Sequence, residues 1–269
     1  MMVRVKLSVV YALVLPLAAA LMVGCSTVPL DKTATMTPTE LYASAKDEVG
    51  NSQWEKAIPL FEKLESRAAG TPLAQQAQLD KAYAQTKAGE PIAAVATLDR
   101  FMRLHPASPA YDYALYLKGM ANFNENLGIL GSYTGQDLAE RDQKASKESF
   151  EAFRELSVRF PESRYTPDAL LRMGYIVQSL AKYEVHVAKY YFKRGAYVAA
   201  INRAQTAVTD YRNVPAVEEA LFVIYKSYEA LGMTGLRDDA KRVLEATYPD
   251  SKFLAGGGVG ETGGWLKLF

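Results

Sequence analysis

The sequence has little of what active sites and cross-linked scaffolds are made of. It contains one cysteine and two histidines in 269 residues, and 30 acidic side chains balance its 31 basic ones. A single cysteine cannot form an intrachain disulfide. Nucleic-acid binding relies on a surplus of basic residues that neutralise phosphates, so the balanced charge argues against a nucleic-acid partner.

The chain also lacks a recognisable catalytic or metal-binding pattern. His105 and His186 are 81 residues apart, and no spacing of His, Cys and carboxylates suggests a zinc site. Adjacent acidic residues such as Glu218 and Glu219 diverge on a helix, so they cannot act as a general acid and base couple. The glycines of "AGGGVG" open no helix and form no phosphate loop. We expect a binding protein that is not an enzyme and needs no metal or cofactor.

The single cysteine, Cys25, follows the first apolar stretch of the chain. Two basic residues, Arg4 and Lys6, precede an uncharged run over residues 7–23, and the small Gly24 comes immediately before Cys25. This is the layout of a secretory signal, with a charged start, an apolar centre and a small residue at the cleavage site. The run is shorter than the roughly 20 residues of a membrane-spanning helix.

The Gly24–Cys25 pair resembles the lipobox of bacterial lipoproteins. The resemblance implies cleavage before Cys25, removal of residues 1–24 as a lipoprotein signal peptide, and a diacylglyceryl and an N-acyl lipid on Cys25. Several acyl chains hold a protein stably on a membrane. Met22 stands where the lipobox usually has Leu. Ser26 follows the cysteine, at the position where an Asp retains such lipoproteins at the inner membrane, so the resemblance implies the outer membrane. An ordinary signal with an incidental cysteine is the alternative.

The rest of the chain repeats a helix-start signal. A hydroxyl residue followed by proline recurs at four places, Thr37, Thr71, Ser108 and Thr166. Such pairs are typical of a helix N-cap with proline at the first helical position, and Thr37 with Glu40 predicts a capping box. The first three prolines, Pro38, Pro72 and Pro109, are spaced by 34 and 37 residues.

A small residue at helix-packing spacing lies inside the units, at Ala57, Ala94 and Ala200, and the units end in "LHPAS", "RFPES" and "TYPDS". These features resemble the tetratricopeptide repeat, a 34-residue pair of antiparallel helices. We expect an all-α fold, a tetratricopeptide-like superhelix (α-solenoid). It has about five antiparallel helix pairs, at roughly 38–66, 72–104, 109–160, 166–211 and 215–247.

The chain accordingly divides into four parts. Residues 1–24 are the signal peptide, 25–36 a lipidated linker, 37–254 the tetratricopeptide-repeat domain and 255–269 a Gly-rich flexible tail that is expected to bury little area. A Gly-rich insertion, 125–141, interrupts the third pair.

The fourth pair begins with an overlong helix, from about residue 166 to 194. One apolar stripe in its first half predicts a core face: Leu170, Met173, Gly174, Val177 and Leu180. In its second half, apolar residues occupy most of the circumference: Tyr183, Val185, Val187, Tyr190, Tyr191 and Phe192. A helix of this kind needs cover on more than one face. The cover comes from the chain itself, for example from 125–141, or from a partner.

Two long motifs narrow the resemblance. The segments "RFPESRYTPDA" and "LAKYEVHVAKYYFKRGAYVAAINR", with the lipobox and the five repeats, are similar to the BamD family of outer-membrane assembly lipoproteins, from the signal to about Phe253. The resemblance implies a lipid-anchored subunit of the β-barrel assembly machinery, on the periplasmic face of the outer membrane of a Gram-negative bacterium. It also implies docking on BamA and other subunits and help in receiving and inserting unfolded outer-membrane proteins. The alternative is another envelope tetratricopeptide lipoprotein that scaffolds cell-wall enzymes.

The resemblance places the contact with BamA on the C-terminal repeats. There, the second helix of the fourth pair carries a predicted core stripe: Tyr197, Ala200, Ile201, Ala204 and Val208. Arg203 flanks this stripe, where its guanidinium reaches a partner carboxylate. A solvated arginine is the alternative.

The concave surface of a stacked solenoid is lined by the first helix of each pair. Four tyrosines lie on those helices in the first three pairs: Tyr42, Tyr83, Tyr113 and Tyr116. Tyrosine offers apolar area with a polar tip, which suits sequence-tolerant capture of an extended peptide. We predict a substrate groove there, and internal packing of these side chains is the alternative. The apolar end of the tail, "WLKLF", fits a weak internal mimic of such a peptide, a clip onto a neighbouring subunit or a chance aromatic end.

Overall fold

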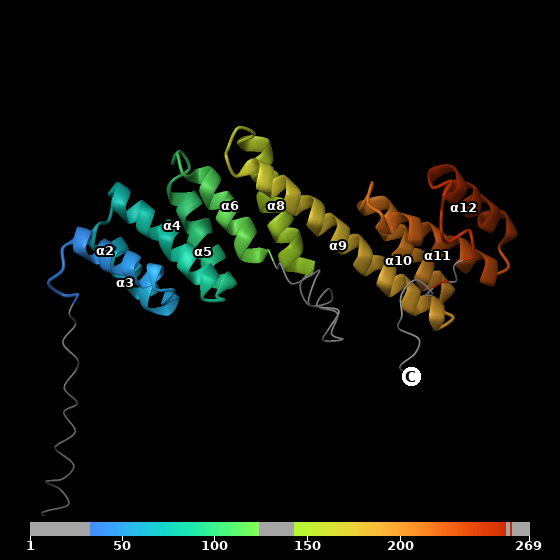
Figure 1. Ribbon diagram of the computed structural model, residues 1–269, viewed down its shortest axis with the longest axis horizontal. Coiled ribbons are helices and arrows are strands. Elements are labelled where there is room, and N and C mark those ends of the chain that lie inside the picture. Colours follow the sequence, from blue (N-terminus) through green and yellow to red (C-terminus); the bar gives the residue numbers. More distant parts are fainter. Residues whose placement is uncertain (1–32, 124–142, 257–258, 260–269) are drawn as a thin grey trace, which may run out of the picture.

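The computed structural model describes residues 33–123, 143–256 and 259, and within these ranges the chain forms helices and no strand. In chain order the helices are α2 (Pro38–Gly50), α3 (Trp54–Arg67), α4 (Pro72–Lys87), α5 (Pro91–Leu104), α6 (Tyr111–Asn122), α8 (Gln143–Arg159), α9 (Thr166–Lys193), α10 (Tyr197–Asp210), α11 (Ala216–Ala230) and α12 (Thr234–Thr247). They follow one another along one long axis, with α2 and α3 at one end and α12 at the other (Figure 1). The predicted signal peptide and the insertion 125–141 lie outside the described residues.

These helices form five pairs, as predicted. The pairs are α2–α3, α4–α5, α6–α8, α9–α10 and α11–α12, and each pair packs against the next. Their observed bounds differ from the predicted ranges by no more than about two residues. The tetratricopeptide-like α-solenoid is therefore confirmed for the described part of the chain.

Two of the predicted caps begin their helices as expected. In the capping box of α2, the backbone N–H of Thr37 donates to Glu40 Oε2 at 2.8 Å and the N–H of Glu40 donates to Thr37 Oγ1 at 3.3 Å. The hydrogen bonds from Thr37 lower the pKa of Glu40. Thr71 Oγ1 accepts from the N–H of Ala74 at the start of α4.

The other two predicted caps are wrong. Ser108 lies in a turn before α6, where its Oγ accepts from the N–H of Ala110, and the helix begins only at Tyr111. Thr166 is already inside α9 and is 5% exposed, and its Oγ1 donates to the carbonyl of Phe160 at the end of α8. In both cases a neighbouring turn uses the hydroxyl, so it does not cap a helix.

Small residues lie where helices approach closely. Ala57, Ala94 and Ala200 are fully buried, as their spacing predicts. In the third pair the small residue is a glycine that the sequence analysis missed. A Cβ at Gly119 of α6 would lie 2.3 Å from Cε1 of Phe153 on α8, and Phe153 is itself fully buried.

One helix, α9, contributes to two hydrophobic cores. Ile176 and Leu180 in its first half are buried in a cluster with residues of α4, α5, α6 and α8. Ala181, Val185 and Ala188 in its second half are buried in a cluster with residues of α10 and α11. This 28-residue helix therefore connects the two halves of the solenoid.

The predicted core stripe in the first half of α9 is only partly right. Leu180 is buried, but Leu170 is 53% exposed and Gly174 is exposed, while Ala169 and Ile176 form the buried face. The difference arises because α10 runs back along the second half of α9 only. The first half packs on α6 and α8 and keeps an uncovered side, where Leu170 and Leu171 are exposed.

The chain itself covers part of the second half of α9. Helices α10 and α11 bury Val185 and Ala188, and Lys189 Nζ of α9 donates to Glu219 Oε1 of α11. Tyr190 remains 51% exposed. The helices α10 and α11 thus give part of the predicted cover, while Tyr183, Val187, Tyr191 and Phe192 remain half-buried. Cover by 125–141 lies outside the described residues, and cover by a partner stays a prediction.

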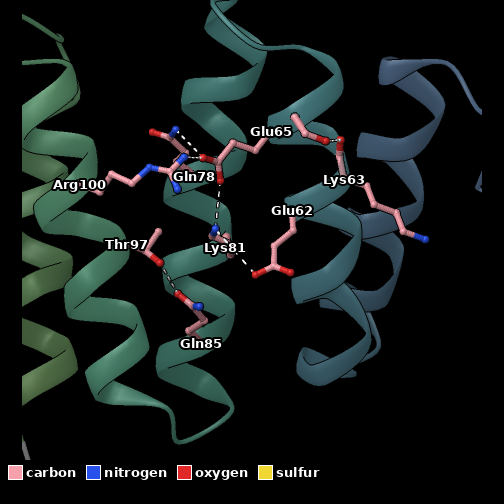
Figure 2. Close-up of polar contacts among 9 residues, drawn as sticks. Glu62, Lys63, Glu65, Gln78, Lys81, Gln85, Thr97 and Arg100 are labelled. Carbon is pink, nitrogen blue, oxygen red and sulfur yellow. Dashed lines mark hydrogen bonds and ion pairs between the residues drawn. The ribbon is translucent and has the colours of Figure 1, made fainter.

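A polar layer lies between the first two pairs (Figure 2). Glu65 of α3 accepts from Gln78 Nε2 and from Lys81 Nζ of α4, both at 3.0 Å, and also from Arg100 of α5. The Lys81 side chain is only 9% exposed, and this burial lowers its pKa. Because an unpaired buried charge is costly, the layer fixes how the second pair sits on the first.

Residues after the last helix cap the C-terminal end. The ring of Phe253 stacks on Phe222 of α11 at 5.4 Å between centroids. Leu254 packs against the same cluster, and so does Val259, which lies in the segment expected to bury little area. The rest of the predicted tail, including "WLKLF", lies outside the described residues.

The contact between Gly119 and Phe153 yields a stability prediction. We expect Gly119→Ala to lower the free energy of unfolding, because overpacking costs about 1–3 kcal/mol and a helical alanine gains only about 0.5–1 kcal/mol over glycine. Gly174→Ala, where nothing lies within 4 Å of the new Cβ, is the matched control and should stabilise by about 0.5–1 kcal/mol. Denaturant unfolding of both variants measures this, and equal shifts would contradict the close approach.

Candidate functional site: a tyrosine band on the first helices

The four predicted groove tyrosines lie on the first helices of the first three pairs, in a row that continues to the fourth pair. We call this row the tyrosine band, and its members are Tyr42, Asp80, Tyr83, Tyr113, Tyr116, Tyr165 and Asp168. It begins on α2, where Tyr42 Oη donates to Asp80 Oδ2 of α4 at 2.9 Å. Lys46 Nζ lies 3.7 Å from the other oxygen of Asp80. The first two pairs are thus joined across the band by a phenol and a carboxylate.

The centre of the band is a group of three tyrosine rings. Tyr165, in the turn between α8 and α9, stacks on Tyr116 at 4.9 Å between centroids and lies 5.2 Å from the ring of Tyr113. The sequence analysis missed Tyr165 because its place before the fourth helix pair gave no sign that it folds back onto α6. Tyr83 extends the band on α4, edge-on to Trp54 at 5.9 Å.

The band ends at the start of α9. Tyr116 Oη donates to Asp168 Oδ2 at 2.7 Å, and Arg172 Nε donates to the same oxygen at 2.6 Å. Each end of the band therefore has a carboxylate with a neighbouring cation, Asp80 with Lys46 and Asp168 with Arg172.

Burial raises the pKa of three phenols of the band, those of Tyr42, Tyr113 and Tyr116. Desolvation, with the nearby charge of Asp80, raises the pKa of Tyr42 to about 12. Desolvation, with the neighbouring Tyr165 and Asp80, raises the pKa of Tyr113 to about 12. The pKa of Asp168 is lowered, because hydrogen bonds from Arg172 and Tyr116 outweigh its desolvation.

All four predicted tyrosines are half-buried, and each also contacts the chain's own residues. Tyr42 packs on Phe61 as well as bonding to Asp80, and Tyr116 packs on Phe153. Internal packing, which was the alternative to a binding groove, is therefore observed for these tyrosines. Part of each side chain nevertheless remains accessible. Such a row of neutral hydroxyls and ring faces is chemically suited to binding an extended chain.

Arg203 lies on α10, in the other half of the solenoid. Its Nη1 donates to Glu184 Oε2 of α9 at 3.2 Å, and the side chains of Arg203 and Glu184 are 46% and 7% exposed. The carboxylate that Arg203 reaches in this structure is thus the chain's own. The sequence analysis missed Glu184, although a carboxylate within the apolar second half of α9 was a visible signal.

A groove of about 760 Å³ lies between α5, α6 and α8. Val95, Leu115 and Ala152 give it apolar walls, and Glu151 and Glu155 line its edge. These two carboxylates bond to Arg154 and Arg159 of the same helix. Within the described ranges, no group of three or more His, Cys, Asp or Glu residues could hold a metal ion, and no helix is long and apolar enough to cross a membrane.

A helical solenoid of stacked pairs belongs to the class of repeat scaffolds, which present extended binding surfaces. The family model described as "Outer membrane lipoprotein" (YfiO) matches residues 34–244. The BamD outer membrane protein assembly factor of Neisseria meningitidis serogroup A is 46% identical over 229 residues, 84% of this chain and 86% of that protein. The chain therefore belongs to the YfiO/BamD family of outer membrane lipoproteins.

More distant relatives carry the same description. BamD of Vibrio cholerae is 32% identical over 229 residues, which are 85% of this chain and 95% of that one. A solved structure of tetratricopeptide-like repeats from a Podosopora anserina putative kinesin light chain covers 80% of this chain at 15% identity with a TM-score of 0.34.

The raised phenol pKa values predict how stability falls at high pH. Unfolded tyrosine ionises near 10.0 and Tyr113 in the fold near 12, so the folded state holds more protons between these values. The contribution of the protonated Tyr113 to the free energy of unfolding is complete below pH 10 and is lost as the pH rises to 12. Tyr113→Phe should therefore show a shallower loss of melting temperature over this window than the wild type. Parallel curves for the two proteins would contradict the burial of this phenol.

Proposed function

We propose that this chain is an outer-membrane protein assembly factor, a non-enzymatic subunit of the β-barrel assembly machinery. The family membership and the printed names of its relatives support this role. In this proposal residues 1–24 are removed and Cys25 carries the acyl chains that anchor the protein to the outer membrane. The solenoid faces the periplasm.

The tyrosine band is the proposed receiving surface for unfolded outer-membrane proteins. The observation that carries this assignment is its extent over four successive pairs. Hydrogen bonds and ring contacts link α2 to α4 and α6 to the start of α9, and Tyr83 of α4 and Tyr113 of α6 pack against one shared hydrophobic cluster. An unfolded barrel strand is extended, alternates apolar and polar side chains, and varies in sequence. Half-buried phenols contact both kinds of side chain without requiring a particular one.

The proposed docking surface for BamA is on the other half, around Arg203. A guanidinium has five N–H donors, and the bond to Glu184 uses one of them. Because Glu184 is buried, its charge holds the guanidinium in place at the edge of α10, where about half of the side chain remains exposed. Glu184 is thus a positioning residue, and Arg203 is the group that meets a partner carboxylate.

Site-specific photo-crosslinking tests the receiving surface. A photoreactive side chain at Tyr83 or at Tyr116 should crosslink to a barrel-derived peptide that ends in Phe. The same group at Ile92 or Val158, which are 87% and 72% exposed on second helices, is the matched control and should give little product. Products from the controls alone, or only from positions in the fourth and fifth pairs, would refute the assignment.

Co-purification from detergent-solubilised outer membrane tests the docking surface. Arg203→Gln should lower the yield of BamA by about tenfold, the effect of losing ~1.4 kcal/mol. Glutamine is chosen because Arg203→Glu would set a second carboxylate against the buried Glu184 and disturb the fold itself. Glu184→Gln keeps the arginine but removes the charge that orients it, so it should lower the yield of BamA by a smaller factor.

The control for docking is Arg154→Gln, since Arg154 is an exposed arginine on α8 that pairs with Glu151. It should leave the BamA yield unchanged, and Arg203→Lys should restore only part of the wild-type yield because lysine lacks the planar fork. An unaltered yield with Arg203→Gln would count against this docking surface without affecting the assignment of the tyrosine band.

A further inference from the structure

The segment before the first helix is fastened to the end of α3. Arg67 Nη1 donates to the carbonyl oxygen of Thr33 at 2.6 Å and to that of Met36 at 3.2 Å. Lys63 Nζ donates to Thr33 Oγ1 at 2.9 Å. We call these three bonds the clasp. The N–H of Met36 donates to the carbonyl of Thr33 and closes a turn. The side chain of Met36 packs against the buried core of the first pair, which includes Leu41 and Phe61.

The clasp sets two like charges side by side. Lys63 and Arg67 are four residues apart on α3, where like charges repel each other by a few tenths of a kcal/mol. Both lie in the last two turns of the helix, where cations are favoured by the helix dipole and by carbonyl oxygens. Here both cations bond to oxygen atoms of Thr33 and Met36, and these bonds explain why two like charges lie side by side.

The clasp limits how far the solenoid extends from residue 25. Eight peptide units separate the Cα atoms of Cys25 and Thr33, so these atoms lie at most about 29 Å apart in any conformation of the chain between them. Without the clasp, the first residue held by the fold would be Met36, whose side chain packs on the first pair, and eleven units would allow about 40 Å. The clasp therefore removes about a quarter of the maximum reach.

We propose that the clasp makes the α2–α3 end of the solenoid its lipid-facing end. Lys63 and Arg67 act as positioning residues that keep this end within about 29 Å of Cys25, and so close to the membrane that receives its acyl chains. The proposal rests on the lipid anchor of the proposed function. The opposite end, at α11 and α12, lies the whole length of the solenoid away (Figure 1).

This orientation also gives the tyrosine band a direction. The band begins with Tyr42 on α2, next to the clasped end, and finishes with Asp168 on α9. A polypeptide bound along the band therefore has one part close to the lipid surface and another part deeper in the periplasm.

Fluorescence quenching on vesicles tests the proposal. The full acylated chain is reconstituted in vesicles of phosphatidylethanolamine and phosphatidylglycerol that contain a lipid with a short-range quencher on its headgroup. A fluorophore is placed through Ala69→Cys, exposed just after α3, or through Thr234→Cys, exposed at the start of α12. Because acylation consumes the thiol of Cys25, the introduced thiol is the one labelled. Quenching should be strong at position 69 and weak at position 234.

Removing the clasp should reduce the difference in fluorescence quenching between positions 69 and 234. The double change Lys63→Ala and Arg67→Ala should lower the quenching at position 69 by at least about twofold, since quenching falls steeply with the added reach. Arg242→Ala, which removes an exposed arginine on α12, is the matched control and should leave it unchanged. Helical content measured by circular dichroism checks that each variant is folded.

Two kinds of result would overturn the proposal. Equal quenching from the two ends, or unchanged quenching at position 69 without the clasp, refutes the lipid-facing end alone, because flotation with the vesicles shows in the same samples that the anchor holds. A wild-type chain that does not float with the vesicles, or that lacks the acyl mass on Cys25, overturns the anchor and this proposal together.

Discussion

A single continuous helix, α9, determines how the two halves of the solenoid are placed. Leu180 and Ala181 are neighbours in the sequence, yet Leu180 is buried in the core of the second and third pairs and Ala181 in that of the last two. An α-helix is stiff over 28 residues because each turn is hydrogen-bonded to the next. The tyrosine band ends on the first half of α9, and Glu184, which holds Arg203, lies on the second half. The proposed receiving and docking surfaces are therefore mounted on one rigid element.

The tyrosines of the band serve packing and exposure together. The ring of Tyr116 lies on Phe153 and Tyr165, and its hydroxyl donates to Asp168. A side chain held by both a ring stack and a hydrogen bond loses little additional conformational freedom when a ligand covers its remaining surface. Packing therefore does not exclude binding here, since it prepares the rings for a ligand.

Local signals in the sequence were enough to predict where the helices lie, but not which residues of other helices they contact. Proline after a hydroxyl residue located α2 and α4 correctly, because capping depends on neighbours three residues away. The same signal failed at Thr166, whose hydroxyl reaches the end of α8. The exposed Leu170, the carboxylate opposite Arg203 and the stacking of Tyr165 depend on which helices meet, and that is decided by packing across distant parts of the chain.

The polar layer between the first two pairs affects how the solenoid can be shortened or extended. Repeat proteins often tolerate the loss or duplication of a terminal unit, because each unit meets its neighbours through similar apolar faces. Here Lys81 of the second pair depends on Glu65 of the first. Deleting the first pair would expose the Lys81 ammonium to water, where it needs no carboxylate. A copied pair inserted at this boundary would instead bury Lys81 against a face that lacks one. The modularity of the fold is therefore limited at this interface to units that place a carboxylate opposite Lys81.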